Sequence, residues 1–124
     1  MIYKQKFFHE QTVYDTNKLL IEIILINHET DNAEVMKFLR QEDEYITSSR
    51  PDLIVIDLSL PRKEGAEALA KIKQIPSLLD VPIVILTTSE IQSTVFQTYG
   101  LTADAFITKP IDSDQFLITV ASLL

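Results

Sequence analysis

The feature that most constrains the fold of this chain is an apolar run that ends in a single carboxylate. Residues 50–65 read RPDLIVIDLSLPRKEG, and Asp57 directly follows the apolar segment LIVI. A short, continuous apolar run rich in β-branched residues predicts a strand buried on both faces, as in a parallel α/β sheet. Such sheets present their chemistry at the carboxyl ends of their strands. Asp57 is therefore predicted to lie at that edge, either as a turn cap or as a reactive group.

Two later apolar runs end in side chains that could act together with this carboxylate. The run VPIVILTTSE (81–90) ends in hydroxyl residues that include Thr87, and the run DAFITKP (104–110) ends in Lys109. In a parallel sheet, all three strand ends lie on one edge. Taken singly, Thr87 is explained as a β-branched residue at a strand end and Lys109 as a solvated loop lysine. Together, they predict a carboxylate, a hydroxyl and an ammonium group at one place.

Four motifs between residues 31 and 124 resemble the receiver domains of two-component response regulators. They are FLRQEDEY, RPDLIVIDLSLPRKEG, VPIVILTTSE and FITKPIDSDQF. The wording is most similar to the single-domain subgroup associated with phytochrome-type kinases. The resemblance implies an α/β, flavodoxin-like receiver fold with a central parallel sheet and helices on both faces. The N-terminal region is atypical for that family.

The resemblance also implies a role for each residue at the strand ends. Asp57 would accept a phosphoryl group from a histidine kinase, which is covalent catalysis by a carboxylate. Thr87 would supply the hydroxyl that follows the phosphoryl group, and Lys109 would be the conserved lysine of the family. Phe106 would be the aromatic residue that moves on activation, and the peptide bond before Pro110 would be cis.

A receiver of this kind uses a divalent cation, because the transferring group carries spread negative charge. The resemblance implies Mg²⁺ held by Asp57, the backbone carbonyl of Ser59 and an acidic pair at the end of the first strand. No convincing acidic pair is present in the N-terminal third of the chain. We therefore expect Mg²⁺ binding to be weak or absent.

Two registers compete for the N-terminal third. In the first, LLIEIILI (19–26) is strand one, and Asn27 and His28 occupy the acidic positions, with Glu29 as a single remaining carboxylate. This register suits the apolar segment, because the central strand of a sheet has two neighbours, whereas MIYKQKFF would sit poorly there.

In the second register, LLIEIILI is strand two, and residues 1–18 must supply strand one and helix one, with Glu10 as the single carboxylate. The wording from residue 31 to Asp57 favours this register, although residues 1–18 are too few by about one helix. Neither register supplies a full acidic pair.

The rest of the chain predicts helices over 33–41, 65–75, 89–99 and 112–124. Asp31 or Asn32 is expected to cap the first helix and Asp112 or Ser113 the last, while Pro76 closes the second. Each helix except the weak one at 89–99 has an apolar stripe that should face inward: Val35, Met36 and Leu39; Ala66, Leu69, Ala70 and Ile72; and Phe116, Leu117, Val120 and Leu124.

Composition excludes several function classes. The net charge of -7 and the pI of about 4.7 argue against a nucleic-acid surface. The absence of cysteine excludes disulfides and thiol catalysis. Every apolar segment is too short to cross a bilayer, and no signal peptide opens the chain, so a cytoplasmic protein without membrane contact is expected. The chain should form one domain, residues 1–124, with an atypical segment at 1–18 and no room for an output domain.

Two function hypotheses follow. The first is a phosphorylatable receiver that takes a phosphoryl group at Asp57 from a histidine kinase or phosphotransfer protein and signals through a downstream protein target. The second is a pseudo-receiver, a fold retained as a protein-interaction module. Any enzymatic activity would be limited to phosphoryl acceptance and slow self-dephosphorylation at Asp57. The sequence leaves open whether the chain forms a homodimer. His9 and His28, the two histidines, are read as surface or capping residues.

Overall fold

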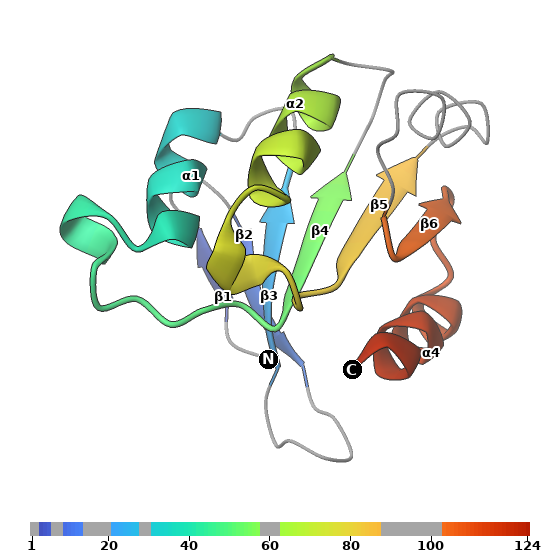
Figure 1. Cartoon of the computed structure of the whole chain (residues 1–124). Coiled ribbons are helices and arrows are strands. Elements are labelled where there is room, and N and C mark those ends of the chain that lie inside the picture. The colour runs from blue at the N-terminus through green and yellow to red at the C-terminus, as the bar shows by residue number, and fades with distance from the viewer. Residues whose placement is uncertain (1–2, 6–8, 14–20, 28–30, 58–62, 88–102) are drawn as a thin grey trace.

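The computed structural model describes residues 3–5, 9–13, 21–27, 31–57, 63–87 and 103–124. For residues 3–5, 9–13, 21 and 63–65 it describes the backbone alone. The described residues form one six-stranded sheet in the order β1-β2-β3-β4-β5-β6 (Figure 1). The strands are β1 (Tyr3–Gln5), β2 (His9–Val13), β3 (Ile21–Ile26), β4 (Leu53–Asp57), β5 (Ile83–Thr87) and β6 (Ala105–Thr108).

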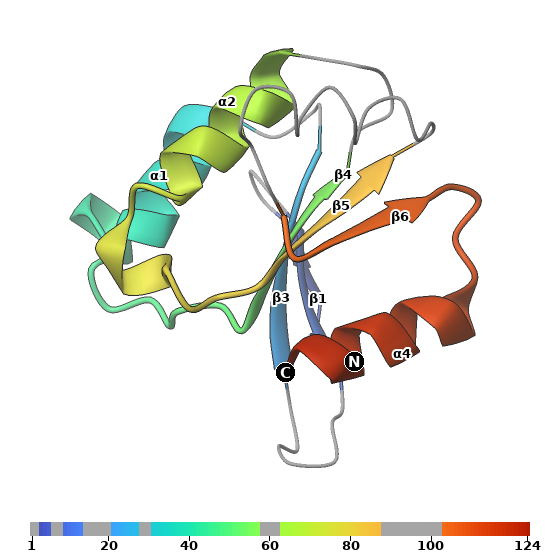
Figure 2. The same ribbon diagram turned by 45° about the vertical axis from the view of Figure 1, so that its right-hand side comes forward.

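The described helices are α1 (Asn32–Arg40), α2 (Lys63–Ile72) and α4 (Ser113–Leu123), together with the short 3-10 turns η1 (Asp43–Tyr45) and η2 (Pro76–Leu78). Helices α1 and α2 cover one face of the sheet, and α4 lies against the other (Figure 2). The predicted fold class, a parallel sheet with helices on both faces, is confirmed. Among the described residues, no helix is both long and apolar enough to cross a membrane.

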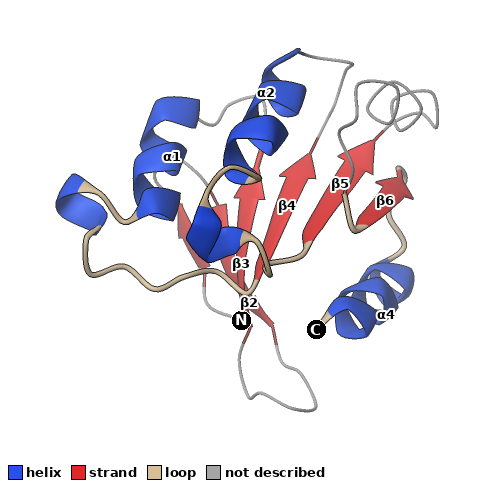
Figure 3. Ribbon diagram, in the orientation of Figure 1, coloured by secondary structure: helices blue, strands red, loops and turns tan. Residues whose placement is uncertain are grey.

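Strands β3 to β6 run parallel to one another (Figure 3). Strand β2 pairs antiparallel with β3 on one side and with β1 on the other. The four parallel strands therefore end at the same edge of the sheet. This edge collects the side chains that the sequence places at strand ends.

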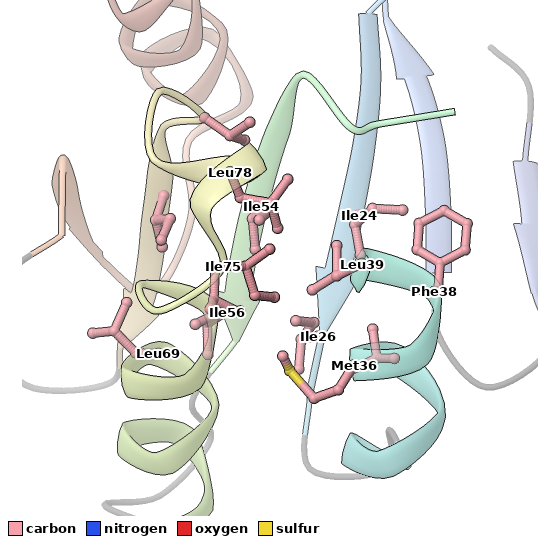
Figure 4. Packing of buried hydrophobic residues seen from close by; sticks show 14 of the residues in the cluster. Ile24, Ile26, Met36, Phe38, Leu39, Ile54, Ile56, Leu69, Ile75 and Leu78 are labelled. Carbon is pink, nitrogen blue, oxygen red and sulfur yellow. The ribbon is translucent and has the colours of Figure 1, made fainter. Parts of the chain in front are cut away.

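Each face of the sheet carries its own hydrophobic core, because side chains alternate along a strand. Ile54 and Ile56 of β4 point to the α1 and α2 face, where they meet Leu39 and Leu69 (Figure 4). Val55 points to the other face, toward the cluster that contains Val120 of α4. Leu53 and Ile54 are wholly inaccessible to solvent. The expectation of a strand buried on both faces is met.

Two aspartates fix the beginnings of neighbouring strands. The Glu22 N–H donates to Asp52 Oδ2 over 3.0 Å, and the Asp52 N–H donates to the Glu22 carbonyl over 2.9 Å. Asp104 repeats the arrangement with Ile83: Ile83 N–H to Asp104 Oδ2 is 2.7 Å, and Asp104 N–H to Ile83 carbonyl is 2.9 Å. Each pair sets the register of two parallel strands.

Three of the four predicted helices are present, with shifts at their ends. Asp31 caps α1 by accepting from the N–H groups of Ala33 and Glu34, and Asp112 caps α4 in the same way. The second helix spans 63–72 rather than 65–75, because Pro76 begins η2 instead of closing the helix. The helix expected at 89–99 lies outside the described residues.

The predicted inner face of the last helix is wrong at two positions. Val120 is buried and Phe116 packs against the core, but Leu117 and Leu124 are 49% and 41% exposed. Leu123 packs against the core instead. An apolar stripe alone could not select the inner face, because α4 has apolar residues around most of its circumference.

The second N-terminal register is also wrong. It required residues 1–18 to supply a parallel strand and a helix, but within those residues the described strands β1 and β2 are antiparallel and lie outside β3. The apolar segment of β3 sits centrally, between β2 and β4, and the polar segment of β1 forms the sheet edge. Burial of apolar surface therefore outweighs the likeness in wording.

Candidate functional site

Three of the predicted site residues, Asp57, Thr87 and Lys109, lie at the carboxyl edge of the parallel strands. Asp57 is the last residue of β4 and lies opposite Leu86 of β5, so that Thr87 is one residue further along. Thr87 lies opposite Thr108, the residue before Lys109. Four consecutive strand ends, β3 to β6, thus define this edge.

Asp57 and Lys109 form an ion pair between Oδ1 and Nζ. Their side chains are 26% and 28% exposed, and Oδ1 itself is shielded from solvent. A shielded carboxylate oxygen is unfavourable without a compensating charge, and the ammonium group supplies that charge. The sequence-based expectation that these two residues converge is met.

The backbone holds Lys109 in this position. Its N–H donates to the Thr87 carbonyl over 2.7 Å, which ties the end of β6 to the end of β5. The peptide bond between Lys109 and Pro110 is cis, as the family resemblance implied. The lysine stem therefore leaves the sheet from a fixed point and reaches across β5 to Asp57.

Thr87 and Phe106 lie on the same face of the sheet. Phe106 is opposite Ile85, and Thr87 is two residues beyond Ile85, so both side chains point to the α1 and α2 face. Thr87 is 1% exposed, whereas Phe106 is half-buried and packs against the edge of that core. The ring is therefore not enclosed in the core. A ring that changes position on activation must have this freedom.

The end of β3 presents a neutral side chain next to Asp57. Ile26 is opposite Ile56, and continuing this parallel register by one residue sets Asn27 beside Asp57. Asn27 is half-buried. His28, Glu29 and the carbonyl of Ser59 lie outside the described residues.

Glu10 is not near this edge. Its Cα is opposite that of Ile24, which is opposite Ile54, three residues before Asp57. Three residues along the strand and two strand spacings across the sheet are each roughly 10 Å. Glu10, the single carboxylate that the second register offered, is therefore too far from Asp57 to contribute to the site.

These residues fit a divalent cation poorly. Mg²⁺ prefers hard oxygen ligands at about 2.0–2.1 Å and gains most from carboxylates. In the described part of the chain, no three His, Cys, Asp or Glu side chains gather in a way that could hold a metal ion. Among the described residues, Asp57 supplies the carboxylate at this edge, and its charge is already matched by Lys109.

The resolved pKa shifts among the described residues lie away from this edge, on α1 and η1. Glu34 and then Asp43 raise the pKa of Lys37, and burial, followed by the charges of Glu44 and Glu34, raises the pKa of Tyr45. Tyr45 also donates to Glu34 over 3.4 Å and meets the ring of Phe38 edge to face at 5.5 Å. These shifts belong to the connection between β3 and β4.

Asp57, Thr87, Lys109 and Phe106 were predicted from the sequence, whereas Asn27 was a candidate only in the first register. The signal that identifies Asn27 is the apolar character of residues 21–26, which predicts a central strand next to that of Asp57. Asp52 and Asp104, which fix the strands, were missed, because an aspartate before a strand also fits a turn.

Comparison with known proteins places this geometry in a family. Residues 13–121 match the response regulator receiver domain. The response regulator Rcp1 of Synechocystis is 42% identical over 99 residues, which cover 80% of this chain and 65% of Rcp1. The transcriptional regulator RpaA of the same organism is 27% identical over 115 residues, or 90% of this chain and 47% of RpaA. The chain thus spans less than two thirds of these relatives.

Solved structures agree with the sequence matches. The phosphorylated cyanobacterial phytochrome response regulator RcpA is 44% identical, with a TM-score of 0.56 over 75% of this chain and 66% of RcpA. The Mn²⁺-bound form of Rcp1 is 41% identical, with a TM-score of 0.54 over 75% of this chain and 67% of Rcp1. The bacteriophytochrome response regulator RtBRR is 31% identical, with a TM-score of 0.62 over 76% of this chain and 58% of RtBRR. This chain belongs to the response regulator receiver family of two-component signalling.

Proposed function

We propose that this chain accepts a phosphoryl group on Asp57 from a histidine kinase or phosphotransfer protein and signals through protein–protein contacts. The observation that carries the proposal is the ion pair between Asp57 and Lys109 at the carboxyl edge of the sheet. It brings a partly exposed carboxylate and a cation to one place on rigid elements. The matches to response regulators support the same assignment.

In the proposed step, one carboxylate oxygen of Asp57 attacks the phosphorus of a phosphorylated donor histidine. An oxygen–phosphorus bond forms, and the nitrogen–phosphorus bond breaks with its electron pair going to the imidazole, which takes up a proton. Lys109 moves from the carboxylate to the phosphoryl oxygens, where a fixed positive charge is most effective. The proposed roles of Thr87 and Phe106 follow: the hydroxyl meets the phosphoryl group and the ring adjusts beside it.

We also propose that the signalling unit is one receiver domain, residues 1–124, with an atypical segment at 1–18. One sheet carries both described core clusters, which supports this reading. The partners would be the phosphoryl donor and a downstream protein, and a homodimer remains an expectation. If Mg²⁺ binds, it would do so weakly at Asp57, since few charged ligands are described there.

The experiment is phosphorylation with acetyl phosphate, followed by intact mass and by the lability of the adduct to hydroxylamine. Wild-type protein should gain one phosphoryl group that hydroxylamine removes, and Asp57→Asn should gain none. Asp80→Asn is the matched control, because Asp80 is an exposed carboxylate, paired with Arg50 over 3.2 Å, near the start of β5. It should label like wild type.

A second candidate function, the pseudo-receiver, is favoured by the incomplete set of carboxylates among the described residues. It predicts no adduct with acetyl phosphate or with an added kinase. Labelling of Asp57→Asn at the wild-type rate would instead place the acceptor at another residue.

A further inference from the structure

The proposed function does not explain why a neutral residue, Asn27, follows β3 beside Asp57. Ile23 and Leu25 point to the α4 face and Ile24 and Ile26 to the other. The same alternation in β4 puts Val55 on the α4 face and Ile56 opposite it. The next residues, Asn27 and Asp57, therefore follow equivalent positions on neighbouring parallel strands.

Neighbouring parallel strands are about 4.8 Å apart. Side chains at equivalent positions on their ends can therefore share one small ligand. An amide at one of them and a carboxylate at the other supply oxygen ligands but a single negative charge. Two carboxylates would supply twice that charge at the same distance.

Within the described residues, the charge of Asp57 is balanced by a side chain and not by a metal ion. Lys109 contacts Oδ1 of Asp57, and both side chains are about three quarters buried. Among the described residues, a divalent cation that approached Asp57 would meet a carboxylate already paired with an ammonium group, and it would have to displace that group or be repelled by it.

We infer that Asn27 is the residue that keeps this site independent of a divalent cation, and that an aspartate at position 27 would create a cation site beside Asp57. The inference rests on the proposed function in taking Asp57 as the reactive carboxylate. It goes further in assigning the charge state of the site to one neutral residue on β3.

The test is Mn²⁺ binding, followed by loss of the free-ion electron paramagnetic resonance signal, which requires no phosphoryl transfer. Wild-type protein should bind Mn²⁺ weakly, and Asn27→Asp should bind on the order of tenfold more tightly or better, because affinity at such sites follows the charge of the ligands. The double variant Asn27→Asp/Asp57→Asn should lose the gain.

Gln74→Glu is the charge-matched control. Gln74 is exposed in the turn after α2, and the change adds the same negative charge away from the strand ends. Its Mn²⁺ affinity should equal that of wild type. Far-ultraviolet circular dichroism and urea unfolding establish that each variant is folded, and the wild-type titration alone tests the first half of the inference.

Phosphorylation then separates this inference from the proposed function. Acetyl phosphate should label the wild type at similar rates with Mg²⁺ and with EDTA, whereas labelling of Asn27→Asp should become Mg²⁺-dependent. Tight Mn²⁺ binding by the wild type, or no gain in a folded Asn27→Asp variant, would overturn the inference and leave the proposed function standing. Absence of label on both proteins, together with the expected Mn²⁺ affinities, would overturn the proposed function alone.

Discussion

The two halves of the sheet differ in strand direction and carry different chemistry. Strands β4 to β6 are parallel and bring Asp57, Thr87 and Lys109 to one edge. Strands β1 to β3 are joined antiparallel, and the end of β3 contributes Asn27, a neutral residue. Parallel order aligns strand ends at a single edge, whereas antiparallel order alternates them between two edges.

The difference separates the residues that stabilise the sheet from the residues that supply reactive groups at its edge. Ile24 of β3 is as buried as Ile54 of β4, at 1% and 0% exposed. Yet the only carboxylate that β2 offered, Glu10, is aligned with the middle of β3. The antiparallel strands β1 and β2 thus extend the sheet beside β3 without bringing Glu10 to the reactive edge.

The largest expected effects test whether β3 is part of the same core as β4. Ile24→Ala and Ile54→Ala should each lower the free energy of unfolding by about 2–5 kcal/mol, because each leaves a cavity among packed side chains. Urea unfolding measures both. Ile46→Ala is the control, since Ile46 is 72% exposed and its loss should change stability by less than about 0.5 kcal/mol. An Ile24→Ala variant as stable as Ile46→Ala would detach β3 from the core.

The next effects compare the aspartates that fix strand beginnings in the two halves. Asp52→Ala and Asp104→Ala should each cost about 1–3 kcal/mol, because an N–H group of the neighbouring strand loses a charged acceptor. Thermal unfolding followed by circular dichroism measures the loss. Asparagine at either position keeps an oxygen acceptor and should recover part of the stability that alanine loses. A cost at Asp104 with none at Asp52 would mean that β3 and β4 hold their register without this contact.

Smaller effects are expected at the helix caps that follow β3 and β6. Asp31→Ala and Asp112→Ala each remove the acceptor for two N–H groups and should cost about 0.5–2 kcal/mol. Serine at either position should restore most of the stability, as measured by urea unfolding. If Asp31→Ala left the stability unchanged while Asp112→Ala lowered it, α1 would be stabilised by packing alone.

The smallest effect concerns pH and the connection between β3 and β4. The pKa of Tyr45 is raised above its usual value of 10.0 by burial and by the charges of Glu44 and Glu34. The folded state therefore holds the phenolic proton more tightly than the unfolded state. Its contribution to stability is complete below pH 10 and is lost as the pH rises through the folded-state pKa.

Tyr45→Phe should reduce the loss of stability on the alkaline side of about pH 10, compared with wild type. Melting temperatures across that range measure it, and Tyr45→Phe at neutral pH provides the baseline. Lys37, whose pKa is also raised, contributes in the same direction and is unchanged in both proteins. Identical alkaline profiles for the two proteins would show that the Tyr45 proton is not linked to folding.

The sequence by itself determined the local elements and the reactive edge. The apolar runs before Asp57, Thr87 and Lys109 predicted buried parallel strands, and residue type narrowed each cap to two neighbouring residues, Asp31 or Asn32 and Asp112 or Ser113. These features depend on periodicity and on residues a few positions apart, which a sequence displays directly.

Only the tertiary structure decided which strand lies beside Asp57. The pairing of β3 with β4, the antiparallel attachment of β2, and the position of Asn27 depend on contacts between distant segments. The inner face of α4, with Leu123 in and Leu117 out, was settled in the same way. Local pattern ranks residues by how well they can be buried, but the shape of the opposing surface determines which of them are.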